Sequence, residues 1–217
     1  MSTAREEILG RVRSALAGSA APEPVVRAYR RGGISDRAQA VELLCERLVD
    51  YNCEVRRIAE SDLSAAIAEA CAARHVFRLG VPPGLPYEWR PADLDVVEDH
   101  DLAPRELDGL DGVVTACTLA IAETGTLVLA AGPAEGRRAL TLVPDLHICV
   151  VRESQIVDSV PAAFAQLGGL ARRPLTLVSG PSATSDIELS RVEGVHGPRQ
   201  LVVLVALENP SPTARST

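Results

Sequence analysis

The sequence contains no lysine, and all 22 of its basic residues are arginine. Lysine forms Schiff bases, holds pyridoxal phosphate and supplies the positive charge of the P-loop, so its absence excludes these three chemistries together. An anionic ligand therefore has to be bound by arginine, by main-chain N–H groups or by the N-terminus of a helix.

Aromatic residues are also scarce, with two Phe, one Trp and three Tyr in 217 residues. This number is too small to build a surface on which the bases of a single-stranded nucleic acid could stack. The formal net charge of −7 also disfavours nucleic acids and anionic membranes as partners. We therefore expect no nucleic-acid partner, and a core made mainly of Val, Leu, Ile and Ala.

The five cysteines form no CxxC pair, and their wide spacing matches neither a zinc site nor an iron–sulfur site. The N-terminal residues MSTAREEILG carry charges where a signal peptide needs an apolar run. No apolar stretch approaches the roughly 20 residues that span a bilayer. We therefore expect a cytoplasmic protein with reduced thiols, no metal site, no iron–sulfur cluster of its own and no membrane span.

The length and the 47% content of hydrophobic residues favour one α/β domain with a small appendage. Residues 2–17 place apolar side chains on one helical face, with Ser2 or Thr3 as the N-cap. The segment 18–33 is rich in proline, glycine and arginine, which indicates a solvated linker or an arm that contacts a partner or folds over a ligand site. We expect three parts: an N-terminal helix with a linker arm (1–34), the α/β domain (35–208) and a flexible tail (209–217).

From residue 35 onward, helical and strand patterns alternate, which is typical of a parallel sheet. Ser35 or Asp36 can cap a first helix of this region and Ser61 a second. The run LVVLVAL at 201–207 is continuously apolar, as a central strand covered on both faces should be. Strands are predicted at 53–58, 75–81, 94–97, 112–117, 126–131, 147–151, 175–179 and 201–207, and further helices near 137–142 and 155–167.

Ligands of open α/β sheets bind at the carboxyl ends of the strands, and three stretches have the character of such loops. The first is AIAETGTLVL at 120–129, where Glu123 stands beside Thr124, Gly125 and Thr126. A carboxylate next to a glycine and two hydroxyls is a candidate nucleophile or acid/base group. The alternative is that Thr124 and Gly125 only make a turn between strands.

The second stretch is LVSGPSATSDIE at 177–188, in which a buried strand leads into Gly180. Its hydroxyls and main-chain amides suit a phosphate or a carboxylate. Asp186 would repel such an anion unless it caps a helix or is protonated, and simple capping of a helix start is the open alternative. The polar residues of this stretch are Ser182, Thr184, Ser185, Asp186 and Glu188.

The third stretch is EGVHGP at 193–198, where glycines flank His196. A titratable imidazole with freedom in the neighbouring backbone suits a general acid or a hydrogen-bond donor to a carbonyl. A purely structural role for His196 stays open, and the same choice applies to His147. No role is assigned to His75 or His100.

Four segments, taken together and in order, resemble the LUD-domain family and within it the lactate utilisation C group. They are AIAETGT at 120–126, LVPDLH at 142–147, SGPSATSDIE at 179–188 and GVHGP at 194–198. The resemblance implies a three-layer αβα sandwich around a mostly parallel sheet, similar to the superfamily of sugar-phosphate isomerases, glucosamine-phosphate deaminases and CoA-transferases. It also implies a part in the oxidation of L-lactate to pyruvate, in a system whose other members carry iron–sulfur clusters.

Two functions follow as expectations. In the first, the protein is a subunit that binds a substrate or cofactor: the loops at 123–126 and 180–188 hold the carboxylate of lactate or pyruvate, and His196 meets the hydroxyl or carbonyl oxygen and can take up a proton. In the second, it is a stand-alone CoA-transferase or sugar-phosphate isomerase with Glu123 as nucleophile or base. A scaffold with an empty site is a third class. The identity of a cofactor is left open by the sequence.

Overall fold

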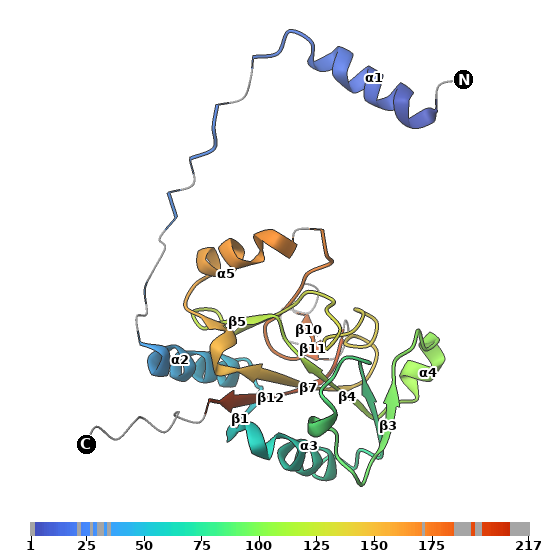
Figure 1. The fold of residues 1–217 in the computed structure, drawn as a ribbon, viewed down its shortest axis with the longest axis vertical. Helices are drawn as coiled ribbons and strands as arrows, with labels where there is room; N and C mark the ends of the chain where they lie inside the picture. The colour runs from blue at the N-terminus through green and yellow to red at the C-terminus, as the bar shows by residue number, and fades with distance from the viewer. Residues whose placement is uncertain are drawn as a thin grey trace, which may run out of the picture.

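The computed structural model describes residues 3–20, 23–26, 28–29, 33, 36–170, 172–184, 192–193 and 197–208. Figure 1 shows the fold and labels many of its elements. The helices are α1 (Ala4–Leu16), α2 (Arg37–Asp50), α3 (Leu63–Ala72), α4 (Pro104–Asp108) and α5 (Val160–Leu167), with short 3-10 turns at Glu60–Asp62, Tyr87–Trp89, Glu153–Gln155 and Gly168–Leu170. The strands are β1 (Glu54–Ala59), β2 (Arg78–Val81), β3 (Asp95–Glu98), β4 (Gly112–Ala116), β5 (Leu119–Ile121), β6 (Thr126–Leu129), β7 (Leu146–Arg152), β8 (Ile156–Val157), β9 (Thr176–Val178), β10 (Ala183–Thr184), β11 (Val192–Glu193) and β12 (Gln200–Leu207).

The centre of the fold is a six-stranded sheet in the order β1-β12-β7-β4-β2-β3. Every neighbouring pair of strands in it is parallel. Residues 201–206 of β12 are buried, and β12 lies between β1 and β7. The predicted parallel sheet and its predicted apolar inner strand are therefore confirmed.

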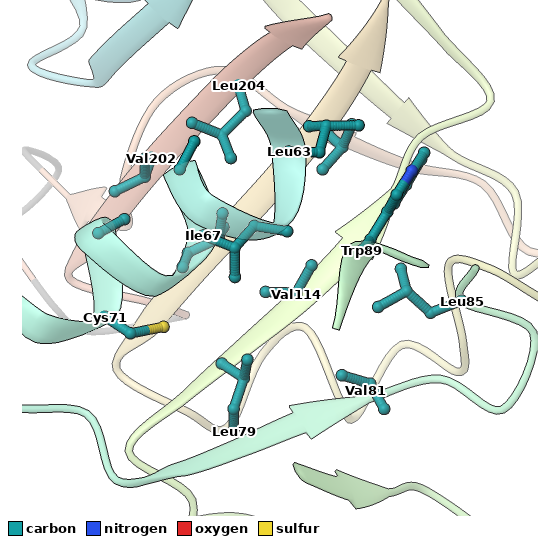
Figure 2. Packing of buried hydrophobic residues seen from close by; sticks show 14 of the residues in the cluster. Leu63, Ile67, Cys71, Leu79, Val81, Leu85, Trp89, Val114, Val202 and Leu204 are labelled. Carbon is teal, nitrogen blue, oxygen red and sulfur yellow. The ribbon is translucent and has the colours of Figure 1, made fainter. Parts of the chain in front are cut away.

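One face of this sheet is covered by α3 and the turn at Tyr87–Trp89. Figure 2 shows Leu63, Ile67 and Cys71 of α3 pointing toward the strands. These side chains are fully buried, and they pack with apolar residues from β2, β4 and β12. Burying the side chains of Leu63 and Ile67 stabilises the fold by roughly 1.5–3 kcal/mol each, so this packing fixes α3 on the sheet.

The opposite face is covered by α2 and by a second sheet in the order β8-β5-β6-β9. Ala120 and Leu127 face the parallel sheet, whereas Leu119 and Val128 face outward and pack against α5. This alternation follows from the two-residue period of a strand. Helices therefore flank the parallel sheet as expected, but a small sheet that the sequence analysis did not anticipate lies between it and α5.

The predicted N-caps at two helix starts are confirmed. Thr3 caps α1 and exchanges hydrogen bonds with Glu6, and the Asp36 side chain accepts a hydrogen bond from the Ala38 N–H at the start of α2. At α3 the predicted cap is wrong, because Ser61 lies within the turn Glu60–Asp62 and Asp62 precedes the helix.

The helix predicted near 137–142 is wrong. This segment forms successive turns, in which the Leu140 N–H donates to the Arg137 carbonyl oxygen and the Leu142 N–H to that of Ala139. Two side chains hold it in place: Arg137 forms an ion pair with Asp99, and Leu140 is fully buried. These tertiary contacts override the local preference for a helix.

The helix predicted at 155–167 begins later than expected. Residues Ile156–Val157 form β8, which pairs with β5, and α5 starts only at Val160. Pro161 lies in the first turn of α5, where its missing N–H is tolerated. Strand pairing therefore takes the first residues of the predicted helix.

The N-terminal helix α1 buries none of its residues, and Figure 1 shows it apart from the sheets. Ile8, Val12 and Leu16 on its apolar face are exposed. Across the described part of the chain, no helix combines the length and the apolar character needed to cross a membrane. Arg27, Arg30 and Arg31 of the predicted linker lie outside the described residues.

Candidate functional site

A cavity of about 290 Å³ opens where β7 and β12 begin. His147 and Leu201, the second residues of these strands, are partners in the parallel register and both line the cavity. The remaining walls come from the turns at 138–142, from β9 and the residues after it, and from 197–198. The described lining consists of Arg138, Thr141, Leu142, His147, Thr176, Leu177, Val178, Ser179, Gly180, Pro181, Ser182, Gly197, Pro198 and Leu201.

The candidate loop at 179–182 follows β9 of the second sheet, and the cavity lies at the amino ends of the parallel strands β7 and β12, not at the carboxyl ends where a ligand was expected. Gly180, Ser182 and Gly197 gather instead at the amino ends of β7 and β12. At the carboxyl ends of β2 and β4, the loop at 131–136 packs against the residues that follow β2. The Gly84 N–H donates to the Pro133 carbonyl oxygen at 3.0 Å, and a Cβ atom on Gly84 would lie 2.6 Å from Pro133.

The first candidate stretch forms the turn between β5 and β6. Gly125 has a φ of +59°, and a Cβ atom there would lie 2.7 Å from the Cβ of Arg47. Glycine is therefore required by both the backbone conformation and the packing against α2. Glu123 is exposed, its N–H donates to the Asp158 carbonyl oxygen at 3.1 Å, and it is not part of the described cavity lining.

A chain of hydroxyl groups joins the first stretch to the second. The Thr124 and Thr126 hydroxyl oxygens are 2.7 Å apart, and those of Thr126 and Ser179 are 2.8 Å apart. Thr126 is buried, whereas Ser179 lines the cavity. The turn at 123–126 thus supports the cavity wall through Ser179. Thr124, Gly125 and Thr126 are not among the described residues that line the cavity.

The second and third stretches meet directly. The Ser182 N–H donates to the Pro198 carbonyl oxygen at 2.8 Å, and both residues line the cavity. Gly180 has a φ of +88° and lies so close to α2 that a Cβ atom would be 2.7 Å from Tyr51. Thr184 belongs to β10, which pairs with β11. Asp186, Glu188 and His196 lie outside the described residues.

His147 contributes a neutral imidazole to the cavity wall. Its Nε2 atom is 2.8 Å from the Thr115 hydroxyl oxygen, and the residue is 1% exposed. Burial lowers the pKa of His147 to about 4, because the charged form loses its hydration. His147 is therefore uncharged at neutral pH and can exchange hydrogen bonds without adding positive charge.

The positive charge of the wall comes from Arg138. It is the only charged side chain among the described residues that line the cavity. The preceding Arg137 is committed elsewhere, because its guanidinium group contacts both carboxylate oxygens of Asp99 at 2.7 and 2.8 Å. Burial of Asp99 opposes its charge, but hydrogen bonds from Arg137 and from the Leu102 N–H outweigh this effect and lower its pKa.

Sequence reasoning missed Arg138, Thr141 and Ser179 as site residues and left His147 without a decided role. Two signals pointed toward them. The lack of lysine left arginine as one of the three kinds of group that could bind an anion, and LVPDLH, which ends at His147, was one of the four segments that carried the family resemblance. In the described ranges, no three His, Cys, Asp or Glu side chains come together as a metal site.

The comparisons with known proteins agree with this fold. The family model of the LUD domain matches residues 41–206. Lactate utilization protein C of Deinococcus radiodurans is 45% identical over 206 residues, which cover 93% of this chain and 95% of that protein. An uncharacterized protein of Neisseria meningitidis is 28% identical over 94% of each chain.

A solved structure is also similar. The crystal structure of a DUF162 family protein from Deinococcus radiodurans is 41% identical and superimposes with a TM-score of 0.70, covering 80% of this chain and 99% of that chain. Together with the family match over most of the sequence, this likeness identifies the chain as a member of the LUD domain family.

Proposed function

We propose that this protein is the small-acid-binding subunit of a system that oxidises L-lactate to pyruvate. Membership in the LUD domain family and the name of the 45% identical relative support a role in lactate utilisation. We place its work in the cytoplasm, where five cysteines without disulfide bonds would stay reduced.

The observation that carries this proposal is the cavity at the amino ends of β7 and β12. It combines one guanidinium group with the hydroxyls of Thr141, Thr176 and Ser179 in a concave site. A guanidinium group binds a carboxylate with two parallel hydrogen bonds. The hydroxyl of Thr141 donates to the Arg138 carbonyl oxygen, so those of Thr176 and Ser179 are left to donate to the 2-oxygen of pyruvate. Each of the three can accept a hydrogen bond from the 2-hydroxyl of lactate.

The electrons and protons released by the reaction determine which steps we assign to this chain and which to its partner proteins. Oxidation of lactate to pyruvate removes the 2-hydroxyl proton, the hydrogen on C2 and, in total, two electrons. The two electrons would pass to iron–sulfur proteins of the same system, and the C2 hydrogen would be released as a proton. We assign the proton of the lactate hydroxyl to His196, which precedes the cavity-lining Gly197 in the chain. Asp186, Glu188 and Thr184 belong to the same proposed site by their place in the segment that follows Ser182.

The alternative function, a stand-alone CoA-transferase or sugar-phosphate isomerase, requires Glu123 at the bound substrate. The exposed position of Glu123, outside the described lining of the cavity, favours the binding subunit over this enzyme. In the preferred function, Glu123 belongs to the turn that supports the wall.

Calorimetric titration of the purified full chain with L-lactate, D-lactate and pyruvate tests the proposal. We expect saturable binding of L-lactate or pyruvate by the chain alone, and lactate oxidation only after iron–sulfur partners are added. Turnover of an acyl-CoA or a phosphosugar by the chain alone, abolished by Glu123→Gln, would establish the alternative. Absence of binding to all three acids would leave a scaffold role.

A further inference from the structure

Two consecutive arginines, Arg137 and Arg138, have different surroundings. Arg137 is tied to Asp99 by two hydrogen bonds and also donates to the Leu102 carbonyl oxygen. Arg138 lines the cavity, and within the described residues no ion pair or hydrogen bond engages its side chain. The pairing of Arg137 therefore fixes the turn from which Arg138 reaches the cavity.

A buried carboxylate that lines the same small crevice does not form an ion pair with Arg138. Glu135 borders a small crevice next to the cavity together with Arg138, but the two form no ion pair. The carboxylate of Glu135 accepts hydrogen bonds from the Thr118 hydroxyl at 2.5 Å and from the N–H groups of Ala130 and Gly132 at 2.6 and 3.0 Å. These three hydrogen bonds use the Glu135 carboxylate to stabilise the local loop. The guanidinium group of Arg138 is therefore not paired with Glu135 and can bind an anionic ligand.

The other polar residues of the described wall carry no charge. His147 is neutral and bonded to Thr115, and the remaining polar side chains are hydroxyls. Arg138 is exposed, so a carboxylate bound to it keeps part of its hydration, and the guanidinium group attracts it by charge-assisted, paired hydrogen bonds. Arg138 is therefore the one described group that can balance the charge of a bound acid.

We propose that Arg138 binds the carboxylate of the ligand, and that the site takes a small monocarboxylate through this single guanidinium group and the neighbouring hydroxyl of Thr176. The inference rests on the proposed small-acid-binding function and names the residue on which its affinity depends. Thr141 is suited to orient the site, because its hydroxyl donates to the Arg138 carbonyl oxygen at 3.2 Å.

The test compares Arg138→Gln with the unchanged chain by calorimetric titration with pyruvate and L-lactate. We expect the substitution to weaken binding about 10- to 100-fold, the usual effect of removing a hydrogen bond to a charged group. Arg138→Lys, which keeps the charge but loses the paired hydrogen bonds, should recover part of the affinity. Arg105→Gln on α4, an exposed arginine outside the cavity lining, should bind as the unchanged chain does.

A ligand series on the unchanged chain gives a result that does not depend on the folding of a variant. Methyl pyruvate keeps the 2-oxygen but has no charge, so we expect its binding to be at least about 10-fold weaker than that of pyruvate. Equal binding of methyl pyruvate and pyruvate, or pyruvate affinity within twofold of normal in folded Arg138→Gln, overturns the assignment of Arg138 and leaves the proposed function intact. If the unchanged chain binds neither acid, the proposed function itself fails.

Discussion

The hydroxyl oxygens of Thr126 and Ser179 lie 2.8 Å apart, although 53 positions separate these residues in the chain. This hydrogen bond joins the turn region between β5 and β6 to the wall of the cavity. It explains how two segments with separate sequence patterns act on one site: the first supports the position of the second. The support is testable by removing one hydroxyl group.

Thr126→Val should destabilise the protein by about 1–2 kcal/mol, because it leaves the partner hydroxyls of Thr124 and Ser179 without their shared neighbour. Thr126→Ser keeps the hydroxyl and should recover most of this loss. Urea denaturation at pH 7 measures both variants. Equal midpoints for Thr126→Val and the unchanged chain would show that the hydroxyl chain contributes nothing.

Gly125→Ala should cost about 2 kcal/mol or more, because it adds strain at a positive φ to a steric clash. The added Cβ atom would meet Arg47 at 2.7 Å. Gly168→Ala is the matched control, since nothing lies within 4 Å of a Cβ atom there. Thermal unfolding of the two variants should differ clearly, and similar small effects would argue against a tight contact between this turn and α2.

The buried His147 makes the stability of the protein depend on pH. Its pKa is about 4 in the folded chain and about 6.5 in an unfolded chain. Between pH 6.5 and 4, His147 is therefore mostly protonated in the unfolded chain and mostly neutral in the folded chain. Its contribution to the free energy of unfolding is fully present above pH 6.5 and is lost as the pH falls toward 4. The loss should reach about 2 kcal/mol at pH 5.

Between pH 6.5 and 5 the carboxyl groups with lowered pKa values contribute little to the change in stability. Asp99 and Glu54 have lowered pKa values in the folded chain, so their contributions are lost only below the ordinary pKa of a carboxyl group. Urea denaturation at several pH values should give a clear slope for the unchanged chain and a flatter one for His147→Gln. Parallel slopes would mean that His147 does not titrate as its burial requires.

The ion pair between Arg137 and Asp99 should respond unequally to loss of either partner. The Asp99 side chain is 2% exposed, whereas that of Arg137 is 35% exposed. Arg137→Gln leaves a buried carboxylate without its cation and should cost about 3 kcal/mol, while Asp99→Asn leaves a cation that can reach water and should cost about half as much. Chemical denaturation of both variants and of the double variant measures the difference, and equal losses would contradict the role of burial.

Much of the fold was predictable because its signals are local. The alternation of helix and strand, the apolar run of β12 and the caps Thr3 and Asp36 follow from the period of the chain and from side-chain chemistry. The segment 137–142 was not predictable, because its conformation depends on an ion pair with Asp99 and on burial of Leu140. The second sheet was not predictable either, because the local sequence does not show which short strands pair with one another.

The site was predictable in part. Glycine-containing bends with hydroxyls indicated Gly180 and Ser182, and both line the cavity. The place of the cavity was not predictable, because the general preference for carboxyl ends points to an edge where the loop at 131–136 packs on β2 and β4. Arg138 was hidden in a segment predicted to be helical, and only the tertiary structure shows that Arg137 pairs with Asp99 whereas Arg138 lines the cavity.

We propose that the cavity between the starts of β7 and β12 binds a small carboxylate. A crystal of the full chain grown with pyruvate tests it most directly, with the same crystal form grown without pyruvate as the control. We expect pyruvate in the cavity, with its carboxylate on Arg138 and its 2-oxygen toward the hydroxyls of the wall. A cavity without pyruvate in crystals that hold the ligand at the carboxyl edge of the parallel sheet would contradict it.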